Sequence, residues 1–317
     1  MMHVKDFAQC CQQIVQKIGE IIIGKREVLE QILLGIVSNG HILIEDYPGL
    51  AKTLIAQLFA ESTDLQFRRV QFTPDLLPGD LTGGYIYNQQ KGTFEFRPGP
   101  LFTNLLLADE INRATPKTQA ALLEAMQERQ ITIEGNRYPL SPPFIVIATQ
   151  NPIEFEGTYP LPEAQLDRFL LKLSVGYPSP EEEQEILARR QQRRSDEVHI
   201  GQIVDHHTLL EMQQTVENIY VSKAIERYIV DLVSETRRNP KIEVGASPRG
   251  SLALFKLARA RAALQVRDFV IPDDVKAVAV VGLSHRIIMK PELWVSRIPE
   301  ETIIQQILDT VPTPKAE

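Results

Sequence analysis

The sequence predicts an α/β fold, in which helices cover both faces of a five-stranded parallel sheet, followed by an all-helical C-terminal domain. Two observations carry this prediction. Through the first 177 residues, short apolar runs alternate with longer segments of helical periodicity, which is the pattern of a parallel sheet. Beyond residue 177 only helical patterns continue. We therefore expect an α/β core over residues 1–198 and a helical domain over residues 199–317.

Two helices are expected ahead of the sheet, over residues 4–20 and 26–37, because apolar side chains recur there at helical spacing. Apolar runs then predict buried strands; in chain order they cover residues 42–45, 67–72, 105–108, 144–148 and 170–175. Helical patterns separate several of these strands, over residues 52–60, 114–127 and 163–168.

Two pairs of short alternating runs interrupt this order. One pair covers residues 84–87 and 93–96, and the other covers residues 131–134 and 137–140 around a Gly135-Asn136 turn. Alternating runs on either side of a turn predict a β-hairpin. The first excursion is long for a compact core, and long excursions of this kind are usually functional.

The chain after residue 177 is expected to contain helices and no further strand. A charged helix is predicted over residues 181–193, and the polar stretch at residues 195–201 suits a domain boundary. The helices of the C-terminal domain are then expected at about residues 207–216, 222–237, 248–265, 272–287 and 299–308.

Composition is that of an ordinary globular protein and argues against nucleic acid as a partner. Hydrophobic residues make up 43% and charged residues 24% of the sequence, and the formal net charge is -7. This acidic balance disfavours unaided binding of nucleic acid. Arg189, Arg190, Arg193 and Arg194 could form a local basic patch, although paired arginines on a helix are more often a solvated face.

The sequence also favours a cytoplasmic protein. No apolar run is long enough to span a membrane, and the N-terminal residues lack the apolar core of a signal peptide. Cys10 and Cys11 are adjacent, which suits neither an ordinary disulfide nor a metal cluster.

Residues 41–53, HILIEDYPGLAKT, have the strand, loop and helix layout of a phosphate-binding P-loop. Backbone N–H groups of such a loop surround the phosphates, and the helix N-terminus adds the positive end of its dipole. Lys52 would reach the β- and γ-phosphates, and the Thr53 hydroxyl would ligate Mg²⁺. The alternative is that Lys-Thr after a Pro-Gly turn simply starts a helix.

The loop departs from the pattern G-x-x-x-x-G-K-[ST] at two positions. Asp46 stands in place of the first glycine and Ala51 in place of the second. Alanine is tolerable at position 51 if its φ is negative. Asp46 puts a carboxylate near the phosphates unless its side chain turns outward, so we expect it to weaken nucleotide binding slightly.

Polar side chains end two further strands. Asp109 and Glu110 close the run LLLADE, and Asn151 follows the run IVIATQ. Ligands bind at the carboxyl ends of strands in open α/β sheets. There Asp109 can hold Mg²⁺ through water, Glu110 can orient and deprotonate the attacking water, and Asn151 can hydrogen-bond the water or the γ-phosphate. The alternatives are two acids that merely end a strand and, at Gln-Asn-Pro, an ordinary turn.

In this order the segments resemble the AAA+ ATPases and, among them, the MoxR family. The resemblance covers nearly the whole chain and is most specific in the stretches GHILIEDYPGLAKT, RVQFTPDLLPGDLTG, LLLADEINRATPKTQAALLEAMQER, ATQNPIEFEGTYPLPEAQLDRF and GASPRG. It implies an AAA+ core that carries two hairpins, the helix-2 insert and the pre-sensor-1 hairpin, and a C-terminal lid domain.

The resemblance also implies roles for individual residues. Asp109 and Glu110 take the Walker B role, and Asn151 takes that of sensor 1. Arg168 resembles the arginine finger that reaches a neighbouring subunit's γ-phosphate, and Arg249 resembles the sensor 2 arginine of the lid. Without the resemblance, we would interpret Arg168 as part of a surface ion pair and Arg249 as a surface arginine. The remaining nucleotide contacts are expected from Ile23 and Gly24 at the adenine and from the Walker A segment with Pro48, Gly49, Leu50, Ala51, Lys52, Thr53 and Leu54.

Resemblance to the MoxR family implies ATP and ADP as ligands, Mg²⁺ as the metal, and ATP hydrolysis as the reaction. It also implies a homo-oligomer, usually a hexameric ring, that acts as a chaperone-like remodelling or assembly machine. The expected partner is a protein with a von Willebrand factor A domain, and nucleic acid is not expected. Two other classes stay open. One is a DNA-dependent motor or magnesium-chelatase-like subunit, and the other is a nucleotide-binding scaffold with little turnover.

Overall fold

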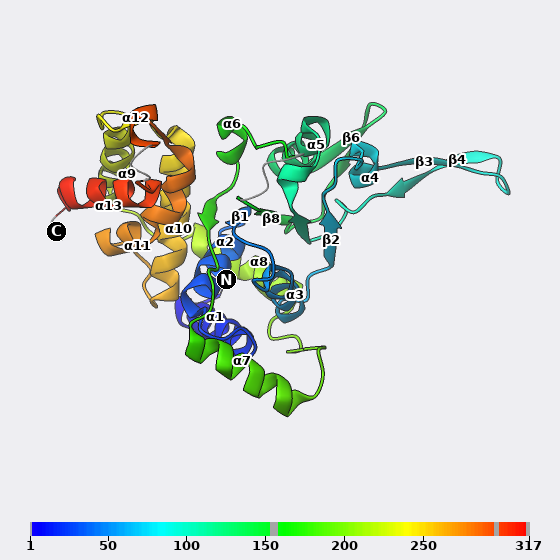
Figure 1. Ribbon diagram of the computed structural model, residues 1–317, viewed down its shortest axis with the longest axis horizontal. Coiled ribbons are helices and arrows are strands. Elements are labelled where there is room, and N and C mark those ends of the chain that lie inside the picture. Colours follow the sequence, from blue (N-terminus) through cyan, green and yellow to red (C-terminus); the bar gives the residue numbers. More distant parts are fainter. Residues whose placement is uncertain (1, 153–157, 295–297, 315–317) are drawn as a thin grey trace.

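The computed structural model describes residues 2–152, 158–294 and 298–314. Its centre is a sheet of five strands in the order β2-β5-β8-β1-β9 (Figure 1). All neighbouring strands are parallel, which confirms the predicted α/β class. The strand bounds are Ile42–Glu45 for β1, Phe67–Gln71 for β2, Leu105–Asp109 for β5, Ile145–Gln150 for β8 and Leu171–Leu173 for β9.

Apolar side chains bury both faces of this sheet. Ile42 and Ile44 of β1 pack on the face that the N-terminal helices cover, whereas Leu43 packs on the opposite face. Every residue of β5 is buried, which explains its uninterrupted apolar run. The first face is covered by α1 (Val4–Gly19), α2 (Arg26–Val37) and α3 (Lys52–Ser62), and the second by α5 (Pro116–Glu128).

Both predicted hairpins are present outside the sheet, and the first projects well beyond it (Figure 1). Aromatic side chains tie the two hairpins together. The hydroxyls of Tyr85 and Tyr138 lie 2.6 Å apart, and the ring of Phe96 stacks on that of Tyr138. The paired strands are β3 (Gly83–Asn88) with β4 (Thr93–Pro98) and β6 (Gln130–Ile133) with β7 (Asn136–Pro139).

The C-terminal part is built mainly of helices. Its longest helix, α10, packs against α9 and α11 and also against α1 and α2 of the core. Helix α8 contacts α1 and α2 as well, so the helical part packs closely on the core. The division into two domains near residue 198 stays a prediction. The longer helices are α7 (Pro180–Arg193), α8 (His206–Glu217), α9 (Lys223–Thr236), α10 (Pro248–Leu264), α11 (Pro272–Leu283) and α13 (Glu300–Thr310). The short ones are α4 (Pro78–Thr82), α6 (Glu163–Leu166), α12 (Pro291–Trp294) and the 3-10 turns η1 (Ile111–Arg113) and η2 (Ser284–Arg286).

The expectation of no strand after residue 177 is wrong. Strand β10 (Ile242–Val244) pairs antiparallel with β11 (Ile288–Met289) within the helical part. Strands this short cannot show an alternating pattern, and each partner lies far from the other in the sequence. The helix expected up to residue 287 correspondingly ends at Leu283.

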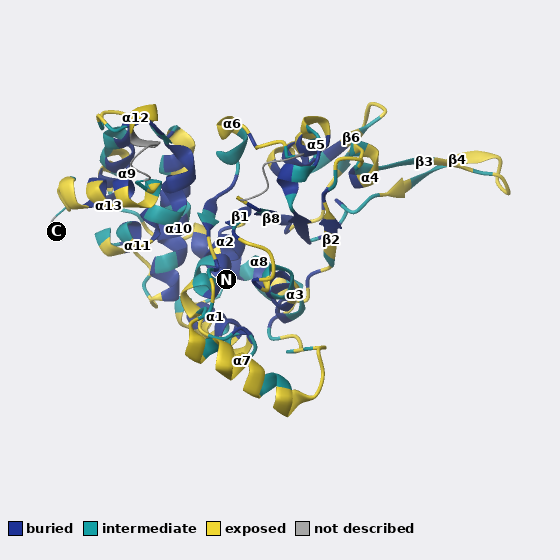
Figure 2. Ribbon diagram, viewed as in Figure 1, coloured by how far each residue is buried: buried dark blue, intermediate teal, exposed yellow. Residues whose placement is uncertain are grey.

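Burial follows this architecture (Figure 2). The sheet and α10 are largely buried, whereas much of α7 and the tip of the long hairpin are exposed. Among the described helices, none combines the length and the apolar composition that crossing a bilayer requires.

Candidate active site

The carboxyl ends of three neighbouring strands bring predicted nucleotide residues to one edge of the sheet. Strand β1 pairs with β8 so that Glu45 lies opposite Gln150, and β8 pairs with β5 so that Ala148 lies opposite Ala108. The P-loop therefore leaves the sheet beside the acids that end β5 and beside the Asn151 that follows β8. Ligand sites of open α/β sheets form at this edge.

Lys52 begins α3, directly after the P-loop. Its ammonium group donates hydrogen bonds to the backbone carbonyls of Asp46 (2.7 Å) and Tyr47 (3.0 Å), which holds the side chain across the loop. Partial burial lowers the pKa of Lys52, and nearby carboxylates, those of Asp109 and Glu110 among them, act against that shift. The Lys52 ammonium group between the loop and these acids is suited to bind phosphates, and the acids are suited to bind a metal.

The side chain of Asp46 does not stand free in the loop. One of its carboxylate oxygens accepts hydrogen bonds from the N–H groups of Val175 (2.6 Å) and Gly176 (2.7 Å) and from the Ser174 hydroxyl (3.0 Å). The other oxygen accepts a hydrogen bond from the N–H of Tyr47 in the loop (2.9 Å). The expected repulsion of phosphates assumed a carboxylate without such partners, whereas both oxygens are held by hydrogen bonds. Asp46 instead fastens the start of the P-loop to the segment that follows β9.

The backbone of Ala51 also departs from expectation. Its φ is +56°, in the left-handed region, and not the negative value under which alanine is tolerable. A side chain in this conformation costs about 1–2 kcal/mol, which a glycine avoids. The P-loop therefore holds local strain at the residue that precedes Lys52.

The acids that end β5 are each held by polar neighbours. Oδ1 of Asp109 accepts a hydrogen bond from the Thr149 hydroxyl (2.6 Å), and Oδ2 accepts one from the Arg69 guanidinium (2.7 Å). The Glu110 carboxylate accepts a hydrogen bond from the Gln71 amide (2.7 Å). These donors fix the orientation of both carboxylates at the edge where the P-loop begins.

Arg69, Gln71 and Thr149 are site residues that the sequence analysis missed. The register of β2 on β5 places Gln71 opposite Asp109, and Arg69 lies on the same strand. A signal was present, because β2 has the sequence FRRVQ and is mostly polar for a strand of an α/β core. Only the strand order shows that these side chains belong beside the acids.

Thr53 and Asp109 fit the magnesium ion that the site is expected to hold. A carboxylate offers about four lone-pair positions, and donors from Thr149 and Arg69 take three of those on Asp109. One position is left for a water on the metal, and the Thr53 hydroxyl lies at the start of α3. Within the described ranges, no group of three or more His, Cys, Asp or Glu side chains forms a metal site of its own.

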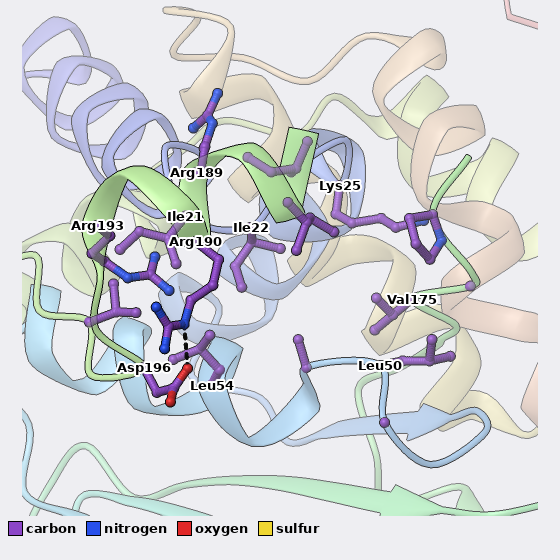
Figure 3. Close-up of a pocket in the computed structure, with 17 residues that line it drawn as sticks. Ile21, Ile22, Lys25, Leu50, Leu54, Val175, Arg189, Arg190, Arg193 and Asp196 are labelled. Atoms are coloured by element: carbon purple, nitrogen blue, oxygen red, sulfur yellow. Dashed lines mark hydrogen bonds and ion pairs between the residues drawn. The ribbon is translucent and has the colours of Figure 1, made fainter. Parts of the chain in front are cut away.

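A mainly apolar cavity of about 290 Å³ lies beside the P-loop (Figure 3). Its walls come from the segment before α2, from the P-loop and the start of α3, from the segment that follows β9, and from α7. An apolar cleft next to a phosphate loop suits a purine base. The predicted nucleotide residues in its lining are Ile23, Gly49, Leu50, Ala51 and Leu54.

Gly24 has a different reason to be glycine. Its φ is +73°, and a Cβ at this position would lie 1.8 Å from a carboxylate oxygen of Glu182 on α7. The left-handed backbone therefore favours glycine at position 24, whereas the Glu182 carboxylate is the end of a flexible side chain and could move aside. The contact of Gly24 with adenine stays a prediction.

Three arginines of α7 belong to the lining of the same cavity, although the Arg189 guanidinium turns away to the Glu20 carbonyl. Arg189, Arg190 and Arg193 are in its lining, and Arg190 forms an ion pair with Asp196 at 2.5 Å (Figure 3). The expectation of a solvated face still holds in part, because the side chains of Arg189 and Arg190 are 40% and 41% exposed and Arg194 is not in the lining. The three lining arginines place positive charge on the rim of the cavity.

Arg168 and Arg249 are brought together, but at the opposite edge of the sheet from the P-loop. They line a second cavity, of about 350 Å³, with residues 39–41, which precede β1. The N–H of Leu170 donates to the carbonyl of His41 (2.7 Å), so the segment that carries Arg168 meets the amino end of β1. Strand β1 has 4 residues and separates the two edges by about 13 Å.

The ion pair that was the alternative interpretation of Arg168 is made by other arginines. The Asp167 carboxylate pairs with Arg286 and lies 3.8 Å from Arg249, which follows the first residue of α10. The Nε of Arg168 is buried without a hydrogen-bond partner among the residues that the structure describes.

Asn151 is buried directly after β8, at the P-loop edge of the sheet. Its backbone carbonyl accepts a hydrogen bond from the Asn112 amide (3.3 Å). The next part of its motif, residues 153–157, lies outside the described residues.

Family models match both parts of the chain. Residues 41–171 match the ATPase family associated with various cellular activities (AAA), and residues 234–307 match the AAA lid domain.

Relatives extend over nearly the whole chain. YeaC of Bacillus subtilis, an uncharacterized protein, is 45% identical over 99% of this chain and 98% of its own. The chaperone MoxR1 of Mycobacterium tuberculosis is 44% identical over 96% of this chain and 82% of its own. A crystal structure from Cytophaga hutchinsonii, 43% identical, covers 98% of this chain and 97% of its own with a TM-score of 0.91. The chain belongs to the MoxR family of AAA+ ATPases.

Proposed function

We propose that the protein binds ATP with Mg²⁺ and hydrolyses it at sites shared between the subunits of a hexameric ring. The observation that carries this proposal is the separation of Arg168 from the P-loop of its own chain by the length of β1. An adjacent subunit, in contrast, can present its Arg168 to that loop. Arginine fingers stabilise charge on the transferred phosphoryl group and are worth about 10³–10⁵ in rate.

Each step of the reaction has residues of suitable chemistry. The P-loop and Lys52 bind the phosphates, and Thr53 with Asp109 would hold the magnesium ion, which would neutralise negative charge on the phosphates. Glu110 takes a proton from the attacking water, with Gln71 orienting its carboxylate. Asn151 hydrogen-bonds the water or the γ-phosphate, and Arg168 and Arg249 of the neighbouring subunit complete the site.

Hydrolysis in such a ring would drive chaperone-like remodelling or assembly of other proteins in the cytoplasm, with a von Willebrand factor A domain protein as partner. A relative that is 44% identical carries the name chaperone, which supports this role. The projecting hairpin also exposes Tyr87 and Phe94 near its tip, and exposed apolar groups of this kind suit contact with another protein.

Steady-state ATP hydrolysis over a range of protein concentrations tests the shared site. Specific activity should rise as subunits assemble, because an isolated subunit lacks a finger. Arg168→Ala should bind ATP with near-normal affinity and hydrolyse it slowly. Specific activity that stays constant while the protein passes from monomer to oligomer would contradict the proposal. A rate that DNA stimulates would favour the motor class instead.

A further inference from the structure

Arg286 of the lid holds the backbone on both sides of Arg168. Its guanidinium donates hydrogen bonds to the carbonyl of Asp167 (2.8 Å), which precedes Arg168, and to the carbonyl of Phe169 (2.5 Å), which follows it. The His285 ring lies 3.1 Å from the same Phe169 carbonyl. Arg286 and Asp167 are 119 positions apart in the chain, so this contact joins the lid to the core.

The contacts of Arg286 use its whole guanidinium. Its Nε donates to the Gly282 carbonyl (2.8 Å), and other N–H groups reach the Leu170 carbonyl (3.4 Å) and the Asp167 carboxylate. A guanidinium has five N–H donors, and with the two flanking carbonyls five acceptors surround this one. Lysine offers a point charge without the planar fork and cannot replace this set.

The hydrogen bonds of this clamp reach the backbone on either side of Arg168. The Arg168 side chain itself lines two cavities, one beside Glu124 and Glu128 of α5 and the other the second cavity described above. Arg249 and Lys256 line that cavity with it, and Asp167 is the one acid among the lining residues. A cavity that gathers so many cations suits an anion supplied from outside the subunit. The clamp therefore determines where the finger stands without occupying its charged group.

We propose that Arg286 is the positioning residue of the Arg168 finger and that it couples the finger to the lid of its own subunit. The inference rests on the proposed function of Arg168. A displacement of about 1 Å in a catalytic group can cost about 100-fold in rate. Loosening the clamp should lower turnover and spare nucleotide binding, because the P-loop and the base cavity lie at the other edge of the sheet.

Arg286→Lys tests this inference, because it keeps a positive charge beside Asp167 and removes the fork. We expect kcat to fall roughly 10- to 100-fold, with the Kd of a fluorescent ADP analogue unchanged. The matched control is Arg259→Lys. Arg259 is a similarly buried lid arginine whose guanidinium bonds the Val216 carbonyl and pairs with Glu217. The control should keep kcat near the wild-type value, and an equal loss in both variants would show general lid damage and overturn the inference.

A double-mutant cycle on kcat gives the decisive result. If Arg286 acts through Arg168, the Arg168→Lys/Arg286→Lys variant turns over no more slowly than Arg168→Lys alone. Losses that multiply would overturn the inference and leave the proposed function standing. A wild-type kcat for Arg168→Lys would instead refute the finger itself. If Arg286→Lys does not fold, Asp167→Asn, which weakens the same clamp, takes its place in the cycle.

Discussion

Replacing Asp46 by glycine restores the first glycine of the usual P-loop pattern, yet the structure predicts that the change destabilises the protein. Asp46 is 4% exposed, and its carboxylate accepts hydrogen bonds from Val175, Gly176 and Ser174. A hydrogen bond to a charged group contributes about 1.5–3 kcal/mol. Because the three bonds share one oxygen and are not independent, we expect Asp46→Gly to lower the free energy of unfolding by about 3–5 kcal/mol.

The same substitution should weaken nucleotide binding, since Val175 and Gly176 also line the base cavity. Without the carboxylate, the segment after β9 is no longer fastened to the P-loop. We expect the Kd of ADP to rise about tenfold, which corresponds to about 1.4 kcal/mol. Urea unfolding followed by circular dichroism measures the stability, and titration of a fluorescent ADP analogue measures the affinity.

Glu45→Gln is the matched control for charge. Glu45 is the neighbouring acid, pairs with Lys172 at 2.8 Å and is partly exposed, so its substitution removes a negative charge without touching residues 174–176. This variant should keep the wild-type Kd for ADP. If Asp46→Gly bound ADP more tightly at unchanged stability, the carboxylate would be repelling phosphates, and the reasoning from its hydrogen bonds would be refuted.

Three further predictions follow from single residues. Ala51→Gly should raise the free energy of unfolding by about 1 kcal/mol, because it relieves the left-handed backbone; an unchanged or lower value in urea unfolding would contradict this. Glu110→Gln should retain ATP binding and nearly abolish turnover, because it removes the base and keeps the shape; a wild-type rate would show that Glu110 is not the base. Burial holds the pKa of His41 at about 3, against 6.5 in the unfolded chain, so the folded state stays neutral while the unfolded chain takes up a proton. The free energy of unfolding should therefore fall as pH drops below about 6.5, and this residue should account for a loss of about 2 kcal/mol at pH 5. Urea unfolding at neutral pH and at pH 5 should show a smaller loss of stability for His41→Gln than for the wild type.

Local pattern was sufficient to predict the elements that build the sheet. A strand buried on both faces has to be apolar along its length, and a helix that covers it has to present an apolar stripe, so both leave a periodic signal. The acids at 109 and 110 could be found for the same reason, because they end the most apolar strand of the core.

Residues whose roles depend on distant partners could not be predicted in this way. Asp46 accepts from residues about 130 positions later, and without that segment its carboxylate is simply an acid in a phosphate loop. Arg69 and Gln71 become site residues only once β2 is known to pair with β5. Arg286 has no local signal at all, since four of its five acceptors lie on the core segment that carries Arg168.

The central claim is that each hydrolytic site takes its finger from a neighbouring subunit, and subunit mixing tests it most directly. Lys52→Ala lacks a working P-loop but keeps its finger, and Arg168→Ala has the opposite defect. Neither should hydrolyse ATP appreciably alone. Combined in one assembly, some interfaces pair an intact P-loop with an intact Arg168, so ATPase activity should return. No recovery in assemblies that native mass spectrometry shows to be mixed would contradict the shared site.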